Sequence, residues 1–75
     1  MVGKGICDEY GKSSWPELVG VKGEVAVSII KKENPYVTQI RILHPNEYYL
    51  PVVRCYRVYV WVDKHDIVIR VPVLG

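Results

Sequence analysis

The sequence predicts an α+β fold, with one helix packed over a small sheet and one long loop. Three observations lead to this prediction: apolar residues at helical spacing within residues 23–35, strict alternation within residues 56–63, and a stretch at residues 44–57 that follows neither pattern. A chain of 75 residues is expected to form a single domain, residues 1–75, and this size leaves little room for an enzyme cleft.

The first element expected is a single helical turn within SSWPELVG, residues 13–20. Pro16 suits the first turn of a helix because no N–H is needed there, and Gly20 suits the end of the turn. The turn is expected to direct Trp15 and Leu18 into the core.

The only long helix is expected in GEVAVSIIKKENP, residues 23–35. Its apolar residues form two pairs at i,i+4 spacing on one face, Val25 with Ile29 and Ala26 with Ile30. Asn34 before Pro35 is a natural end, because a residue that precedes proline disfavours the helical conformation.

Alternating patterns predict three strands in the second half of the chain. They are TQIRIL with Ile40 and Ile42 on one side, YRVYVWVD with Val58, Val60 and Val62 toward the core, and IVIRV with Ile67, Ile69 and Val71 on one side. The polar turn DKHD, residues 63–66, predicts that the last two strands form an antiparallel hairpin.

The stretch HPNEYYLPVVRCYR, residues 44–57, does not fit the interior of a sheet. Pro45 and Pro51 cannot donate hydrogen bonds to a neighbouring strand, and each restricts the residue before it to an extended conformation. The stretch therefore predicts a stiff, extended loop. Long loops in compact domains usually carry function.

Composition and charge exclude several classes of function. A net charge of +2 with scattered Lys and Arg residues predicts no nucleic-acid partner, and the longest apolar run is too short to span a membrane. His44 and His65 show no metal-ligand spacing with each other or with the cysteines, so neither a metal nor another cofactor is expected. Ser13 and Ser14 lack a His and an acid to activate them, which predicts that the chain is not an enzyme.

The chain has two cysteines, Cys7 and Cys55. One disulfide, as in a small secreted domain, is favoured over two free thiols in a cytosolic protein. Closing so long a loop would stabilise the fold by about 4 kcal/mol. Residues 1–12 lack the hydrophobic core of a signal peptide, which predicts either a mature form with an added methionine or a protein made inside the cell.

Four segments, GKSSWPELVG, IIKKENP, RC-RV-V-VD and VPVLG, together resemble the potato inhibitor I family of serine protease inhibitors. They match in order and spacing over nearly the whole chain. The resemblance implies one helix against a small mixed sheet, with an exposed loop joining two neighbouring parallel strands. It also implies a Cys7–Cys55 bridge and a secreted or vacuolar protein whose loop enters a protease active site.

The loop departs from the family's pattern at nearly every position. By spacing from Cys55, Pro51 takes the place before the scissile bond, while Leu50 and Val52 replace a Thr and an acidic residue. Pro51 fits the primary pockets of trypsin-, chymotrypsin- and subtilisin-like enzymes poorly. If Leu50 filled that pocket instead, Pro51 would follow the scissile bond, where its missing N–H obstructs cleavage.

The resemblance also implies a support role for Arg54 and Arg57, because arginines at these places brace the loop in the family. The side chains of Leu50 and Val52 accept no hydrogen bonds, so the usual brace is expected to be lost. Arg57 would then be left to solvent, to Glu47 or to backbone carbonyls.

Two functions follow, and a protein-binding module, natural or engineered, is preferred. Four of the six tyrosines lie on the loop and the strand after it, and tyrosine gives a large contact area at a small entropy cost. Its binding residues would be Asn46, Glu47, Tyr48, Tyr49, Leu50, Pro51, Val52 and Val53, flanked by Tyr56 and Tyr59. The partner would be a protein, and the same patch could drive self-association.

The alternative is an active serine protease inhibitor that blocks a protease active site with residues 46–54. Pro51, or Leu50 in the shifted register, would then make the primary contact.

Overall fold

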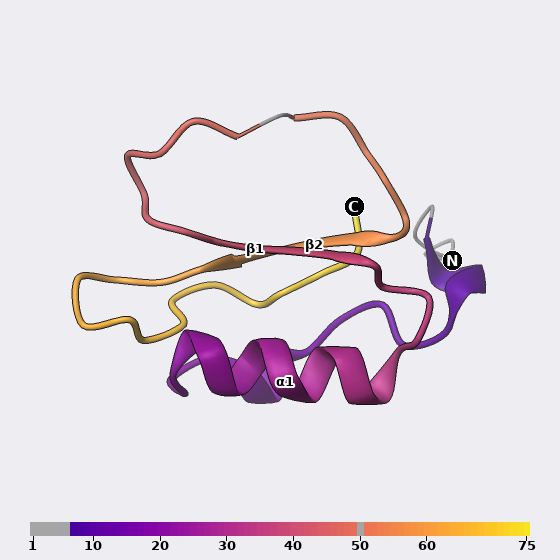
Figure 1. The fold of residues 1–75 in the computed structure, drawn as a ribbon, viewed down its shortest axis with the longest axis horizontal. Helices are drawn as coiled ribbons and strands as arrows, with labels where there is room; N and C mark the ends of the chain where they lie inside the picture. The colour runs from indigo at the N-terminus through magenta and orange to yellow at the C-terminus, as the bar shows by residue number, and fades with distance from the viewer. Residues whose placement is uncertain (1–6, 50) are drawn as a thin grey trace, which may run out of the picture.

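The computed structural model describes residues 7–49 and 51–75 (Figure 1). Its elements are the 3-10 turns η1 (Asp8–Tyr10) and η2 (Pro16–Leu18), the helix α1 (Gly23–Glu33), and the strands β1 (Gln39–Leu43) and β2 (Arg57–Trp61). The two strands are parallel neighbours, with Gln39 opposite Arg57 and Leu43 opposite Trp61. Isolated antiparallel bridges, such as that between Val58 and Leu74, add to this pair and give the sheet its mixed character.

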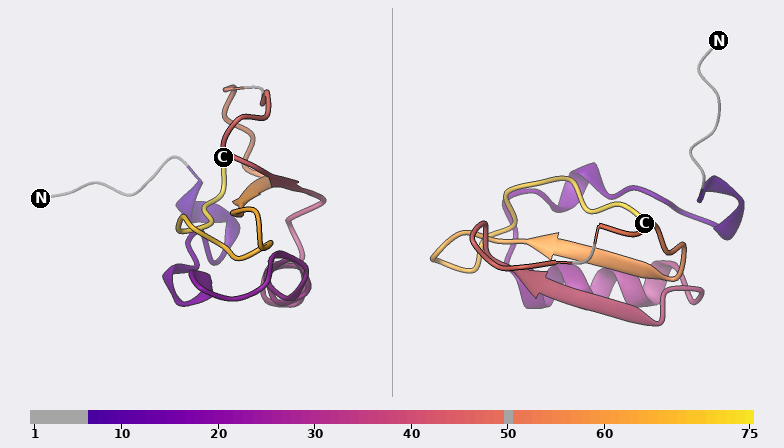
Figure 2. Two further views of the ribbon diagram at one scale, coloured as in Figure 1. Left: turned by 90° about the vertical axis from the view of Figure 1, so that its left-hand side faces the viewer. Right: turned by 90° about the horizontal axis from the view of Figure 1, so that it is seen from above.

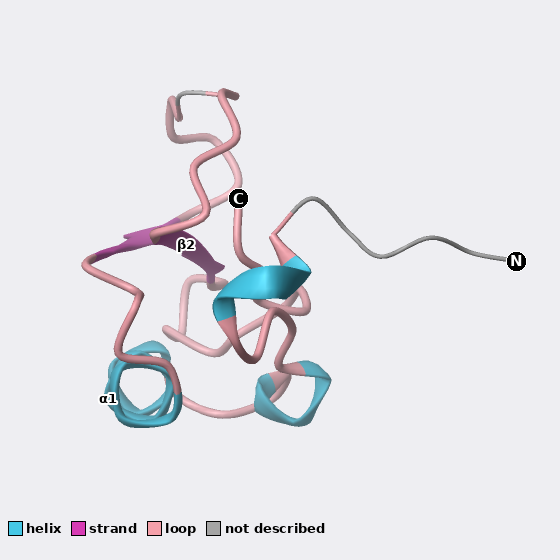
Figure 3. Ribbon diagram, turned by 90° about the vertical axis from the view of Figure 1, so that its right-hand side faces the viewer, coloured by secondary structure: helices cyan, strands magenta, loops and turns pink. Residues whose placement is uncertain are grey.

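The molecule has three layers along one direction. Figures 1 and 3 show α1 on one side of the strands and the loop of residues 44–56 projecting on the other side. The right-hand view of Figure 2 shows β1 and β2 lying side by side. The predicted α+β fold is confirmed, and the loop stands on the face of the sheet that the helix does not cover.

The turn η2 forms where the sequence predicted it. Trp15 and Leu18 are both buried, as expected. The indole Nε1 of Trp15 donates a hydrogen bond to Glu33 Oε1 at 2.9 Å, which links the turn to the end of α1.

None of the helices among the described residues is long and apolar enough to cross a membrane.

The helix buries a narrower face than the pattern predicted. Ala26 and Ile30 are fully buried and Ile29 is half-buried, but Val25 is 46% exposed, so its predicted place in the core is wrong. A helix turns about 100° per residue, and the buried face is centred on Gly23, Ala26 and Ile30, which leaves Val25 on the far side of that arc. Gly23 lies in the centre because a Cβ there would approach a Val62 methyl carbon to 2.9 Å.

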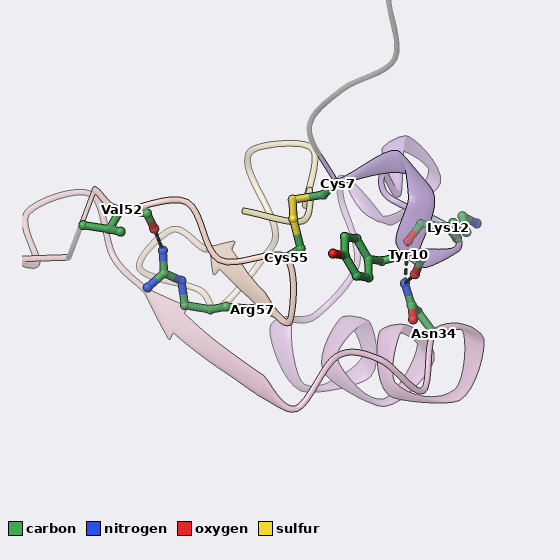
Figure 4. The surroundings of a disulfide bond; sticks show 7 residues. All are labelled: Cys7, Tyr10, Lys12, Asn34, Val52, Cys55 and Arg57. Carbon is green, nitrogen blue, oxygen red and sulfur yellow. Dashed lines mark hydrogen bonds between the residues drawn. A yellow bond between two sulfur atoms is a disulfide. The ribbon is translucent and has the colours of Figure 1, made fainter.

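Asn34 ends α1, as predicted, and also ties the helix to the N-terminal segment. It is only 2% exposed, and its Nδ2 donates to the carbonyl oxygens of Tyr10 and Lys12 at 2.8 Å each (Figure 4). Its Oδ1 accepts a hydrogen bond from the backbone N–H of Tyr36 at 2.9 Å. One side chain therefore joins three separate points of the backbone.

Replacing Asn34 with Ala should lower the free energy of unfolding by about 2 kcal/mol, because it leaves two carbonyls and one N–H without their partner. Asn34→Asp should be at least as damaging, since a carboxylate would then face both carbonyl oxygens. Urea unfolding measures both losses, with Ser28→Ala on the exposed side of α1 as the control. A loss below about 0.5 kcal/mol for Asn34→Ala would show that water replaces these bonds at no cost.

The alternation in the second strand is confirmed, whereas β1 is less buried than expected. Val58, Val60 and Val62 are all fully buried against the helix side. Ile40 is half-buried, but Ile42 is 40% exposed.

The side of the predicted third strand that faces the core is the side of Val68, not that of Ile69 and Val71. Val68 is the buried residue, at 1% exposure, whereas Ile69 and Val71 are more than 40% exposed. The Oδ1 of Asp63 accepts hydrogen bonds from the backbone N–H groups at 65 and 67, and Asp66 adopts a positive φ of 63°. After this tight turn the chain pairs antiparallel with the end of the second strand, as predicted, but only through a short bridge between residues 62 and 68, with backbone hydrogen bonds from Asp63 to Ile67 and from Ile69 to Trp61.

Candidate functional site: the loop between the two strands

The loop of residues 44–56 carries almost all of the predicted site residues. Those described are exposed: Asn46, Glu47, Tyr48, Tyr49, Pro51, Val52 and Val53. Tyr48 is the most open of the large apolar side chains, at 80% exposure. Leu50, the other candidate for the primary contact, lies outside the described residues.

The loop begins in a turn closed by His44 and Glu47. The backbone N–H of Glu47 donates to the His44 carbonyl at 2.9 Å, and Glu47 Oε1 accepts from the backbone N–H of His44 at 2.8 Å. The same carboxylate oxygen lies 2.9 Å from His44 Nδ1, while His44 Nε2 lies 3.6 Å from Asp66 Oδ1. The imidazole thus stands between the loop and the turn of residues 63–66.

The hydrogen bond to Glu47 raises the pKa of His44, and the same bond lowers the pKa of Glu47. The stability that the protonated His44 adds to the folded chain should therefore be complete below the ordinary pKa of 6.5. It should be lost as the pH rises through the raised pKa. The contribution of Glu47 is lost only when the pH falls through its lowered pKa. An NMR titration should place the pKa of His44 above 6.5, and Glu47→Gln should bring it down. An unchanged titration in Glu47→Gln would remove Glu47 as the cause.

Beyond the tip, Arg57 supports the loop from below. It opens β2 and is only 5% exposed, and its Nη2 donates a hydrogen bond to the backbone carbonyl of Val52 (Figure 4). Its guanidinium carbon lies 4.5 Å from the centre of the Tyr59 ring. Of the three alternatives expected for Arg57, the structure therefore shows a backbone carbonyl, an acceptor that the side chain at position 52 does not affect.

Before the tip, Tyr49 rests on two aromatic rings from β2. Its ring centre lies 5.0 Å from that of Trp61 and 5.6 Å from that of Tyr59, both in edge-to-face geometry. The guanidinium carbon of Arg70 lies over the Trp61 ring, 4.7 Å from its centre. Such aromatic pairs contribute about 0.5–1.5 kcal/mol each beyond their buried area. We call Tyr49, Tyr59 and Trp61 the aromatic brace.

The four tyrosines near the loop lie in three different surroundings, and their predicted role in binding a partner stays a prediction. Only Tyr48 points freely into solvent at the tip, while Tyr49 and Tyr59 belong to the aromatic brace. Tyr56 lies lower, beside Cys55. Trp61 follows Tyr59 by two residues in β2, so the alternation of a strand places both rings on one face, and this is the one signal in the sequence for the contact of Trp61 with the loop.

The loop ends at a disulfide. Cys7 and Cys55 are bonded, with their Cα atoms 5.2 Å apart and 48 residues between them in sequence, which confirms the predicted pair. Arg54 does not show the predicted support role: its side chain is exposed and makes no hydrogen bond to another described residue. Only its carbonyl takes part, accepting from the backbone N–H of Arg57 at 3.0 Å.

The site is thus an extended, projecting segment fixed at both ends. Within residues 7–49 and 51–75, no group of three His, Cys, Asp or Glu side chains is placed to hold a metal ion. What the arrangement offers is a preorganised backbone for a partner that binds extended chains.

Comparison with known proteins gives a consistent result. The family model of the potato inhibitor I family matches residues 7–75. An inhibitor of trypsin and Hageman factor from Cucurbita maxima is 46% identical over 87% of this chain and 94% of its own length. A trypsin/subtilisin inhibitor from Amaranthus caudatus is 45% identical over 83% of this chain and 88% of its own.

A solved structure shares the fold as well as the sequence. The crystal structure of bitter gourd trypsin inhibitor superposes with a TM-score of 0.82 and 45% identity, and the match covers 87% of this chain and 94% of that one. With a family model that spans the loop, the strands and the disulfide described above, the chain belongs to the potato inhibitor I family of protease inhibitors.

Proposed function

We propose that this protein inhibits a serine protease by presenting residues 46–54 to the active site. The observation that carries the proposal is the double support of the exposed loop: Arg57 bonded to the carbonyl of Val52 on one side of the tip, and Tyr49 seated on Trp61 on the other. A loop already fixed in an extended shape loses little entropy on binding, and its ends stay together if it is cut. The two relatives described above are named as protease inhibitors, which favours this function over a module for an unrelated partner.

The primary contact sets which protease is inhibited. Pro51 is exposed on the loop and stands in the position that precedes the scissile bond in the family's pattern. A proline ring has neither a long cationic nor an aromatic group to fill a deep pocket, and its φ is fixed near −65°. We therefore expect a target whose primary pocket accepts proline, rather than one that requires a basic side chain.

An inhibition panel tests the proposal. Trypsin, chymotrypsin, subtilisin and a proline-directed serine protease would each be titrated with the purified chain, with chemically blocked active-site serines as the control. Nanomolar inhibition of one enzyme is the expected result, together with direct binding to that enzyme that is lost when its active site is already occupied by a substrate-like inhibitor. If the chain inhibited no enzyme of the panel, the proposal would be contradicted. A module that binds another kind of protein would then be favoured.

A further inference from the structure

A groove lies at the base of the loop, on the side where the chain returns to β2. It has a volume of about 440 Å³ and is lined by Tyr10, Tyr36, Val53, Arg54, Cys55 and Tyr56. We call it the flank groove. Its aromatic walls are accessible: Tyr36 is 61% and Tyr56 41% exposed.

The floor of the groove is rigid. The rings of Tyr10 and Tyr36 meet edge to face, with centres 5.4 Å apart. The backbone of both tyrosines is bonded to the buried side chain of Asn34, and Cys55 is fixed by its disulfide. Figure 4 shows Tyr10 beside this disulfide. A partner would therefore meet a formed surface and would lose little free energy in ordering it.

The groove is continuous with the loop proposed to enter the protease. Val53 and Arg54 belong to both, since they follow Pro51 along the chain and also line the groove. At about 3.3 Å per extended residue, Cys55 lies within about 13 Å of Pro51 along the chain. A standard interface covers about 800 Å² on each partner, a disc of about 16 Å radius, so a protease centred on the loop tip reaches this flank.

The charge of the groove indicates what would fill it. Arg54 is exposed and is the only charged residue in the lining, which otherwise consists of three tyrosines, Val53 and the disulfide-bonded Cys55. An exposed cation in the lining of an apolar groove complements an apolar side chain that has a carboxylate next to it.

We propose that the flank groove is a second contact surface for the inhibited protease, and that it takes an apolar side chain bordered by a carboxylate from the enzyme surface beside the active-site cleft. This inference rests on the proposed function. The groove adds affinity and selectivity among enzymes that accept the same loop.

The test uses the protease that the full chain inhibits most strongly, and measures the rate constants for association and dissociation. Tyr36→Ser should speed dissociation at least 10-fold, because exposed interface tyrosines are frequent hot spots. Tyr56→Ser should act in the same direction, and Arg54→Gln should weaken the salt dependence of association. Val25→Ser, on the side of α1 away from the sheet, is the matched control and should leave both rate constants unchanged.

The outcomes separate the two proposals. If the unmodified chain inhibits a protease but Tyr36→Ser and Tyr56→Ser keep its rate constants, the groove is not a contact surface and the loop function stands. If the unmodified chain inhibits no protease, both proposals fail. Thermal unfolding is measured for each variant: Tyr36→Ser loses the ring contact with Tyr10 and should unfold at a lower midpoint, whereas Tyr56→Ser should keep the midpoint of the unmodified chain, so its faster dissociation is not a loss of fold.

Discussion

Replacing Leu50 with Thr, Pro51 with Leu and Val52 with Asp should turn the protein into an inhibitor of chymotrypsin- or subtilisin-like enzymes, with a gain in affinity of 100-fold or more. A leucine in the primary pocket buries apolar area that a proline ring cannot, worth about 1.5–3 kcal/mol or roughly 10- to 100-fold. The aspartate would stand beside Arg57, which already bonds the backbone of the same residue. A charge-assisted bond there would fix the loop further.

Partial variants separate the two effects. Pro51→Leu alone should give the gain that comes from filling the pocket, and Leu50→Thr with Val52→Asp alone should give only a stiffer loop. Inhibition constants for both enzymes measure each gain. If the triple variant inhibited neither enzyme while its thermal unfolding stayed unchanged, loop chemistry would not be what sets the specificity of this scaffold.

The parts of the fold that repeat along the chain could be predicted from the sequence. The buried valines of β2 and the pair Ala26 and Ile30 follow from the periods of a strand and a helix. The exposure of Val25 and the burial of Val68 could not be predicted. A periodic pattern shows which residues share a face, but the phase, which face is buried, is not contained in the pattern. That phase depends on where the next element packs, and for Val68 it depends on side-chain bonds in the turn before it.

The site was harder to predict for a different reason. The bond from Arg57 ends on the carbonyl of Val52, and every residue has such a carbonyl, so no sequence letter reveals it. The contact of Tyr49 with Trp61 joins residues from the loop and from β2 that only the folded chain brings together. Replacement of the family's polar residues was visible and left backbone carbonyls open as partners of Arg57, but the sequence did not show which carbonyl: one brace was exchanged for another.

That exchange leads to the second large effect. Removing the supports should convert the inhibitor into a substrate of its target protease. Arg57→Ala deletes a buried hydrogen bond from a charged donor and a cation over the Tyr59 ring, which should cost about 2–3 kcal/mol of stability. With the segment after the tip unsupported, its cut end can leave before the bond is resealed. We expect the target protease to cleave the chain at least 30-fold faster, while the initial binding weakens less. Mass spectrometry measures the rate of cleavage.

Matched substitutions distinguish a positioning role from a general loss of stability. Tyr49→Phe keeps the ring on Trp61 and should behave as the unmodified chain, whereas Tyr49→Ser removes it and should accelerate cleavage as Arg57→Ala does. Asn34→Ala, of similar cost to the fold but with its hydrogen bonds to Tyr10, Lys12 and Tyr36 rather than to Arg57 or the aromatic brace, should leave the cleavage rate per bound molecule unchanged. The aromatic brace depends on ring contact rather than on an ion pair. The resistance to cleavage that Tyr49 confers should therefore persist at 1 M salt, where the Debye length is about 3 Å and surface charge pairs are screened. Equal cleavage of Tyr49→Phe and Tyr49→Ser would show that the rings beneath the loop do not hold it, and that Arg57 and the disulfide suffice.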